Sequence, residues 1–158
     1  MRLALGADHA GVGLKRDVKR FLDELHVDYE DFGTNNEDSV DYPDIAELVA
    51  EGVARGTFDR GILICGTGIG MAIAANKVPG VRAAPVTDLE SARLAREHND
   101  ANVLALGARI LPRERALELV RTFLDTPFAG GRHARRIRKI TALEQPQEQD
   151  TDTDVSRR

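Results

Sequence analysis

The chain contains one cysteine, Cys65, which stands directly before a glycine-rich stretch in the segment ICGTGIG at residues 64–70. The backbone N–H groups of such a loop, with the N-terminus of a helix behind it, can bind the oxygens of an anion. The same positive field favours the thiolate form of Cys65, which could then act as a base or a nucleophile. The residues that would form this anion hole are Gly66, Thr67, Gly68, Ile69 and Gly70.

Two other interpretations of the glycine loop stay open. Cys65 can be an ordinary buried residue at a strand end, with glycines that only form a tight turn. The glycines, with Asp88 further along the chain, also resemble a dinucleotide-binding fingerprint in which the acidic residue binds a ribose. That fingerprint requires a glycine where this chain has Met71, which counts against a nicotinamide-dependent oxidoreductase.

Further titratable side chains occur in two short motifs. Asp8 and His9 belong to GADHAG near the N-terminus, and His98 and Asn99 belong to EHND at residues 97–100. No two histidines have metal-ligand spacing, and a single cysteine cannot form a structural zinc site. We therefore expect no metal.

Four short apolar runs and a more polar segment at 27–33 alternate with longer amphipathic stretches, which is typical of a doubly wound α/β fold. The predicted strands are at residues 3–7, 27–33, 62–65, 81–86 and 102–107. The predicted helices are at residues 11–25, 43–55, 69–77, 89–97 and 112–124. Right-handed crossovers through these helices give a Rossmann-like sheet of about five parallel strands with helices on both faces, a three-layer αβα arrangement.

Ligands of such sheets bind outside the carboxyl ends of the strands. Asp8 and His9 follow the first predicted strand, Cys65 ends the third, and residues 107–109 follow the fifth. We therefore expect these residues to meet at one edge of the sheet.

The composition limits the class of protein. The 158 residues are 42% hydrophobic and carry a formal net charge of -4, which indicates one globular domain and argues against a general nucleic-acid or membrane surface. The single cysteine, and an N-terminus with no cationic segment followed by a long apolar one, favour a cytoplasmic protein.

The C-terminal part of the chain divides into a basic segment and a polar tail. Residues 132–139 contain five Lys or Arg, and Arg132 and Arg136 are four residues apart, so they share a face if the segment is helical. Two arginines on one helical face suit a terminal phosphate. From residue 145 the composition is polar without an apolar period, so we expect a domain at 1–144 and a disordered polar tail at 145–158.

Five motifs, in this order and spacing, resemble type B ribose-5-phosphate isomerase of the ribose/galactose-6-phosphate isomerase family. They are GADHAG, DYPD at 41–44, ICGTGIGMAIAANK at 64–77, REHNDANVLALGAR at 96–109 and GGRHARRI at 130–137. The resemblance implies an aldose-ketose isomerase of the pentose phosphate pathway that interconverts ribose 5-phosphate and ribulose 5-phosphate. Alternatives are an isomerase of galactose or allose 6-phosphate, and a sugar-phosphate-binding module without activity.

The resemblance also implies a catalytic role for four residues. Asp8 and His98 would open the sugar ring, and Cys65 would move a proton from C2 to C1 through a cis-enediolate. The loop N–H groups, with the Thr67 hydroxyl beside them, would stabilise the negative oxygen of that intermediate. No redox cofactor and no metal would be needed.

Other residues would bind the substrate. By resemblance, His9, Arg132 and Arg136 bind the phosphate with help from Arg109, and Tyr42 and Asn99 line the sugar pocket beside the loop residues. Members of the family form homodimers, often paired into tetramers, with active sites shared between subunits. His98, Asn99 and Arg109 would then come from the partner chain.

Overall fold

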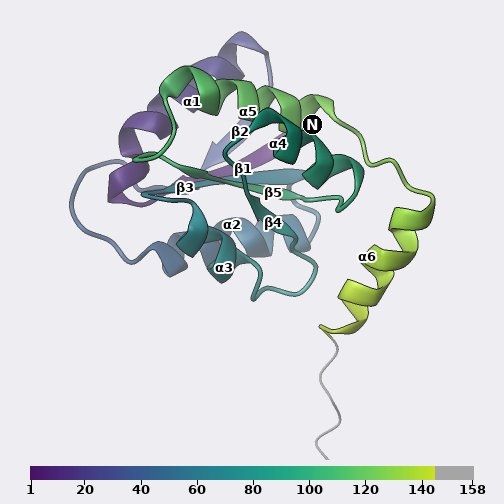
Figure 1. Cartoon of the computed structure of the whole chain (residues 1–158). Coiled ribbons are helices and arrows are strands. Elements are labelled where there is room, and N and C mark those ends of the chain that lie inside the picture. The colour runs from purple at the N-terminus through teal and green to yellow at the C-terminus, as the bar shows by residue number, and fades with distance from the viewer. Residues whose placement is uncertain (145–158) are drawn as a thin grey trace, which may run out of the picture.

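Five strands form one parallel sheet in the order β2-β1-β3-β5-β4 (Figure 1). Their bounds are β1 Arg2–Ala7, β2 Asp28–Asp31, β3 Arg60–Cys65, β4 Ala83–Pro85 and β5 Val103–Gly107. β1, β3 and β5 are almost entirely apolar and buried, because helices cover both faces of the sheet. The computed structural model describes residues 1–144, so the predicted tail at 145–158 lies outside the described residues.

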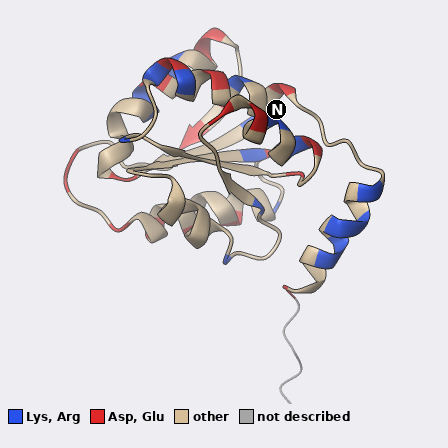
Figure 2. Cartoon of the chain, viewed as in Figure 1, with Lys and Arg blue, Asp and Glu red and all other residues tan. Residues whose placement is uncertain are grey.

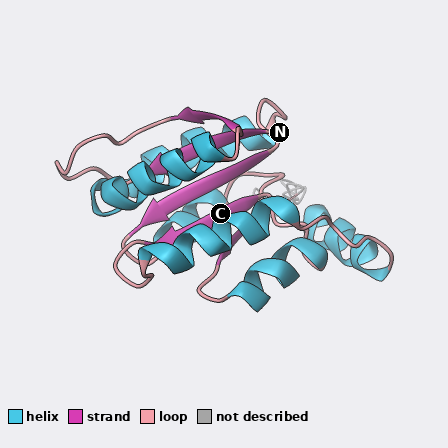
Figure 3. Ribbon diagram, turned by 90° about the horizontal axis from the view of Figure 1, so that it is seen from above, coloured by secondary structure: helices cyan, strands magenta, loops and turns pink. Residues whose placement is uncertain are grey.

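Helices form a layer on each face of the sheet, and one further helix lies outside these layers, as the view from above and the view in Figure 1 both show (Figure 3). They are α1 Val12–Glu24, α2 Tyr42–Ala54, α3 Ile69–Ala75, α4 Leu89–Glu97, α5 Arg113–Asp125 and α6 Arg132–Ala142. α1, α4 and α5 pack on one face, and α2 and α3 pack on the other. The predicted three-layer fold is confirmed.

The spacing of apolar residues in α1 shows why this segment forms a surface helix. Leu14, Val18 and Leu22 recur every four residues and are buried on the sheet. Each such side chain contributes on the order of 1.5–3 kcal/mol when it leaves water. α1 also buries Lys15, which the apolar pattern did not predict.

The strand register brings distant polar residues to one edge of the sheet. Ala7 of β1 lies beside Ile64 of β3, and Cys65 lies beside Gly107 of β5. The chain runs outward from β1 to β2 and then crosses to β3, so the ends of β1 and β3 meet where the strand order reverses. Ligand sites of doubly wound folds lie at this switch point.

α6 lies outside the layers and buries none of its residues (Figure 1). Lys and Arg recur along this helix (Figure 2). It contacts the rest of the chain near its two ends: His133 stacks on His98 with ring centroids 4.2 Å apart, and Glu144, just beyond the helix, accepts a hydrogen bond from the Gly80 N–H. The predicted helix in the basic segment is therefore confirmed.

The remaining differences from the predicted elements are local. β2 and β4 are shorter than expected, and a turn of 3-10 helix at His9–Gly11 precedes α1. Asp8 starts this turn, since its Oδ1 accepts a hydrogen bond from the Ala10 N–H. None of the helices within residues 1–144 combines the length and the apolar character that crossing a membrane requires.

Candidate active site

A pocket of about 430 Å³ opens at the carboxyl edge of the sheet, beside the end of β3. Its lining residues are Asp8, Tyr42, Cys65, Gly66, Thr67, Ile69, Gly70, Ile73 and Arg109. All of them except Ile73 were predicted from the sequence as site residues. The structure therefore brings residues from four separate parts of the chain into one pocket.

Cys65 is both packed and in contact with the pocket. Only 5% of its surface is exposed, and its Sγ accepts a hydrogen bond of 3.2 Å from the Gly68 N–H. A backbone N–H that donates to sulfur stabilises a thiolate more than a thiol. The interpretation of Cys65 as a buried strand-end residue is thus correct about its burial. Its sulfur, however, also accepts a hydrogen bond, and the residue lines the pocket.

The glycines of the loop are required by close packing. Gly68 has φ of +81°, and a Cβ there would lie 3.0 Å from the backbone carbon of Leu106. A Cβ on Gly70 would lie 2.7 Å from the ring of Tyr42. These contacts hold the loop between β5 on one side and the start of α2 on the other.

The loop offers backbone donors to the pocket. The Thr67 hydroxyl accepts a hydrogen bond of 3.2 Å from the Ile69 N–H, which fixes the start of α3. Within residues 1–144, the N–H groups of Thr67 and Gly70 donate to no protein acceptor. Donors that are already in place and face a pocket can bind the oxygens of an anion.

Asp8 and His9 lie directly beyond β1. Asp8 is buried, with 6% of its surface exposed, and lines the pocket. His9 does not line this pocket in the single chain; its Nδ1 accepts a hydrogen bond of 3.3 Å from the Val40 N–H. A ring nitrogen that accepts a hydrogen bond holds no proton, so the ring proton of neutral His9 is on Nε2.

Arg109 borders the pocket of its own chain. The resemblance assigned Arg109 to the partner chain, and that assignment stays a prediction. Within this chain the Arg109 guanidinium lies against Gly66, because a Cβ added to that glycine would lie 3.2 Å from a guanidinium nitrogen. The tight turn after β5 explains this position, because the N–H of Arg109 donates to the carbonyl oxygen of Gly66. A cation therefore borders the pocket within one chain.

The other predicted residues lie apart from the pocket. His98 ends α4, Asn99 follows it, and Arg132 and Arg136 lie exposed on α6. His133, which the sequence motifs did not single out, stacks on His98. Partial removal from water, with the nearby His98 and the Arg132 and Arg136 guanidinium groups, lowers the pKa of His133 below its usual value. The single chain does not join this group to Cys65.

The dinucleotide interpretation fails on the sheet order. β5 lies between β3 and β4, so Asp88, which follows β4, is not on the strand next to the glycine loop. Both carboxylate oxygens of Asp88 are engaged by Ser91, at 2.8 Å each, as the cap of α4. Asp88 is thus a helix cap, and the position of Met71 is buried core.

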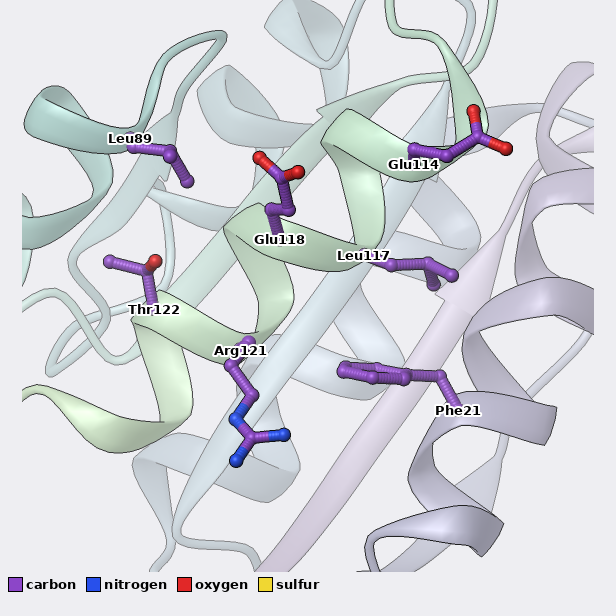
Figure 4. A pocket seen from close by; sticks show the side chains of 7 residues that line it. All are labelled: Phe21, Leu89, Glu114, Leu117, Glu118, Arg121 and Thr122. Atoms are coloured by element: carbon purple, nitrogen blue, oxygen red, sulfur yellow. The ribbon is translucent and has the colours of Figure 1, made fainter.

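A second hollow, of about 490 Å³, lies between α1, α5 and the start of α4 (Figure 4). Phe21 and Leu117 face one another across it, with Glu118 and Arg121 on its rim. None of the predicted site residues lines this hollow. The Cys65 pocket is therefore the candidate active site.

Fold and pocket together define a doubly wound α/β protein whose ligand site combines a thiol, a glycine loop and an arginine at the switch point of the sheet. The sequence model of the Ribose/Galactose Isomerase family matches residues 3–140. The chain belongs to this family.

Named relatives agree with that assignment. The chain is 46% identical over 144 residues to ribose-5-phosphate isomerase B of Escherichia coli, a match that covers 91% of this chain and 97% of the relative. A structure of ribose-5-phosphate isomerase B from Clostridium thermocellum superposes with a TM-score of 0.90 at 53% identity, over 91% of this chain and 97% of the other. The Mycoplasma genitalium enzyme with bound ribulose-5-phosphate superposes at 0.89 with 43% identity, over 92% and 97%.

Proposed function

We propose that this protein is a ribose-5-phosphate isomerase that interconverts ribose 5-phosphate and ribulose 5-phosphate, with Cys65 as the base. The observation that carries the proposal is the common pocket of the Cys65 thiol, the loop donors and Asp8. Membership of the family and the isomerases among its relatives support the choice of substrate. Galactose or allose 6-phosphate remains the alternative substrate, because the same loop chemistry serves a six-carbon sugar.

The reaction needs a base, an acid and donors for a negative oxygen. After ring opening, the Cys65 thiolate takes the proton from C2, and the electrons of the C2–H bond form the C1–C2 double bond of an enediolate. The former carbonyl oxygen at C1 then carries the negative charge, next to the loop N–H groups. The proton of the C2 hydroxyl passes to the oxygen at C1, and as the carbonyl forms at C2 the Cys65 thiol returns its proton to C1, so no atom or electron is gained or lost.

The positions of the donors fit this charge development. One preorganised donor to a developing oxyanion contributes about 2.7–4 kcal/mol to catalysis. The N–H groups of Thr67 and Gly70, which have no acceptor within residues 1–144, supply such donors, and Asp8 supplies a carboxylate for proton transfer at the ring oxygen. Arg109 brings positive charge to the same pocket.

The proposal includes a homodimer with shared sites, which can pair further into a tetramer. His98, Asn99, Arg132 and Arg136 do not line the pocket of their own chain, so they are available to the pocket of a second copy. The pocket is bordered by exposed apolar side chains: Ile69 is 54% exposed and Ile73 is 59% exposed. Such side chains next to an incomplete site favour an interface there.

The direct test is an NMR time course of ribose 5-phosphate with the purified protein in D₂O, with EDTA and without nucleotide. We expect ribulose 5-phosphate that carries solvent deuterium at C1, because the thiol exchanges its proton with solvent during the enediolate stage. Six-carbon aldose phosphates run in parallel identify the preferred chain length. Binding of these sugars without turnover of any of them would contradict the proposal and leave only a binding module.

A further inference from the structure

Lys15 is the most completely buried charged residue of the described chain, with 1% of its surface exposed. It belongs to α1, and its ammonium group points to the segment that follows β2. Nζ donates to Asp31 Oδ1 at 2.7 Å, to the Thr34 carbonyl oxygen at 2.5 Å and to Asn35 Oδ1 at 2.9 Å. Three donors meet three acceptors, so the charge is fully satisfied although it is buried.

These acceptors hold the beginning of the loop at residues 32–41, which connects β2 to α2. The same stretch is bound to the end of β1, since the Thr34 N–H donates to the Ala7 carbonyl oxygen at 2.6 Å. Asp31 completes the cluster by accepting from the Gly33 N–H at 2.8 Å. Burial alone would raise the pKa of Asp31, but its hydrogen bonds to Lys15, Gly33 and Lys19 lower it below the usual value.

The 32–41 loop ends directly before Tyr42, the first residue of α2, which lines the Cys65 pocket. The Val40 N–H of this loop donates to Nδ1 of His9, the residue after Asp8 of the same pocket. Residues 35–39 between the two ends are exposed. Within residues 1–144, one hydrogen bond joins a side chain of this stretch to its backbone: the Asp38 N–H donates to Asn36 Oδ1. Val40 is thus held from two directions, by α2, which begins two residues later, and by the anchored beginning of the loop.

We infer that Lys15 is a positioning residue for the proposed reaction: by fixing the 32–41 loop it keeps the Val40 N–H on His9, so that the His9 ring presents its Nε2–H to the phosphate of the substrate. The inference rests on the proposed function for the identity of the phosphate ligand. In this arrangement a buried ammonium group holds a loop, and a backbone N–H of that loop sets the tautomer of an imidazole that binds the ligand.

The test compares Lys15→Met with Lys19→Met. Lys19 also binds Asp31, with Nζ 3.0 Å from Oδ2, but it makes no hydrogen bond to Thr34 or Asn35, so it is the matched control. We expect Lys15→Met to raise KM for ribose 5-phosphate about tenfold, the loss of one hydrogen bond to a charged group, with kcat changed less than about threefold. Lys19→Met should keep the wild-type KM.

The second measurement does not require turnover. In ¹⁵N NMR spectra of the ring nitrogens, His9 of the wild type and of Lys19→Met should carry its proton on Nε2, while Lys15→Met should show a mixture of tautomers and weaker binding of inorganic phosphate. A wild-type proton on Nδ1, or an unchanged tautomer and KM in Lys15→Met, would overturn the inference. A protein inactive on every sugar phosphate, with these NMR differences intact, would refute only the proposed function.

If Lys15→Met does not fold, Asn35→Ala decides the question. Asn35 is exposed, so its truncation spares the core while it removes one acceptor of Lys15. We expect a KM increase of about two- to threefold at an unchanged unfolding temperature, together with partial loss of the Nε2–H tautomer. Unchanged values of both would overturn the inference.

Discussion

The Cys65 loop and helix α6 are both predicted to bind the substrate, but they are built in opposite ways. The loop is enclosed by its own chain: a Cβ on Gly107 would lie 2.7 Å from the backbone of Thr67, and Cys65 is almost fully buried. α6 has no buried residue and is attached near its ends. The comparison teaches that Cys65, its loop and Asp8 meet within one chain, whereas the α6 arginines lie apart from that pocket and, under the proposed function, serve a second copy.

The largest effect is expected at the centre of the enclosed half. Cys65→Ala removes the proposed base and should lower kcat by about 10²–10⁴-fold, the usual contribution of a positioned general base. The side chain is small, so the fold should persist. Steady-state kinetics with ribose 5-phosphate measure the loss, and a titration with the same sugar should show affinity close to that of the wild type. Wild-type turnover by this variant would remove Cys65 from the mechanism.

Mixing of two defective variants tests the division of the site between chains. Arg136→Ala should raise KM strongly, because it removes a proposed phosphate ligand. In a mixed dimer with Cys65→Ala, a shared site would combine Cys65 of one chain with Arg136 of the other. Random exchange makes half of the dimers mixed, and each has one intact site of two, so about a quarter of wild-type activity should return at low substrate concentration.

The same mixture identifies a site confined to one chain. In that case every site would carry one of the two lesions, and co-refolding would restore nothing beyond the sum of the separate variants. The control is a mixture of Cys65→Ala with itself, taken through the same refolding. If the mixture shows no gain in activity, the proposal of a shared site is wrong, while the role of Cys65 as the base is unaffected.

The enclosed half is also the part that the sequence predicts best. Apolar runs indicate where the strands lie, and ligands of doubly wound folds bind at the carboxyl ends of the strands. These two rules alone predict that Asp8 and Cys65 lie at one edge of the sheet. The order of β4 and β5 cannot be read in this way, because both strands are short and apolar and either order satisfies the helical connections.

Two features escape the sequence for physical reasons. Lys15 stands next to Leu14 in an ordinary amphipathic pattern, and only the fold shows that Asp31 and the Thr34 carbonyl oxygen converge on it. Arg109 was assigned to the partner chain by resemblance alone, and a motif carries no information about the contact of its guanidinium with Gly66 of the same chain. Tertiary contacts, not local propensity, decide such positions.

Two glycine substitutions sharpen the contrast between enclosed and open backbone. Gly68→Ala should destabilise the protein by about 1–2 kcal/mol from its left-handed conformation alone, with a further loss from contact with Leu106. Gly13→Ala is the matched control, since nothing lies within 4 Å of its Cβ, and it should stabilise α1 by about 0.4–1 kcal/mol. Urea unfolding measures both. Because the Gly68 N–H donates to Cys65, the backbone shift that alanine forces at residue 68 should also lower kcat, whereas Gly13→Ala should leave kcat unchanged. Equal stability of the two variants would show that the loop is not tightly enclosed.

The smallest expected effect concerns pH and the attachment of α6. His133 has a lowered pKa in the folded protein, so between its usual value of 6.5 and that lower value the unfolded chain binds more protons than the folded one. Stability should therefore fall as the pH drops below about 6.5 and should not depend on this group above it.

A proton on His133 would also place a cation against His98 and the α6 arginines, which weakens the ring stack. NMR titration of the His133 ring protons should show a midpoint below 6.5 while the Cys65 loop amides stay unchanged. His133→Ala is the control that should remove this group's part of the pH dependence of stability; a loop that shifts along with His133 would mean that the two halves of the site are coupled within one chain.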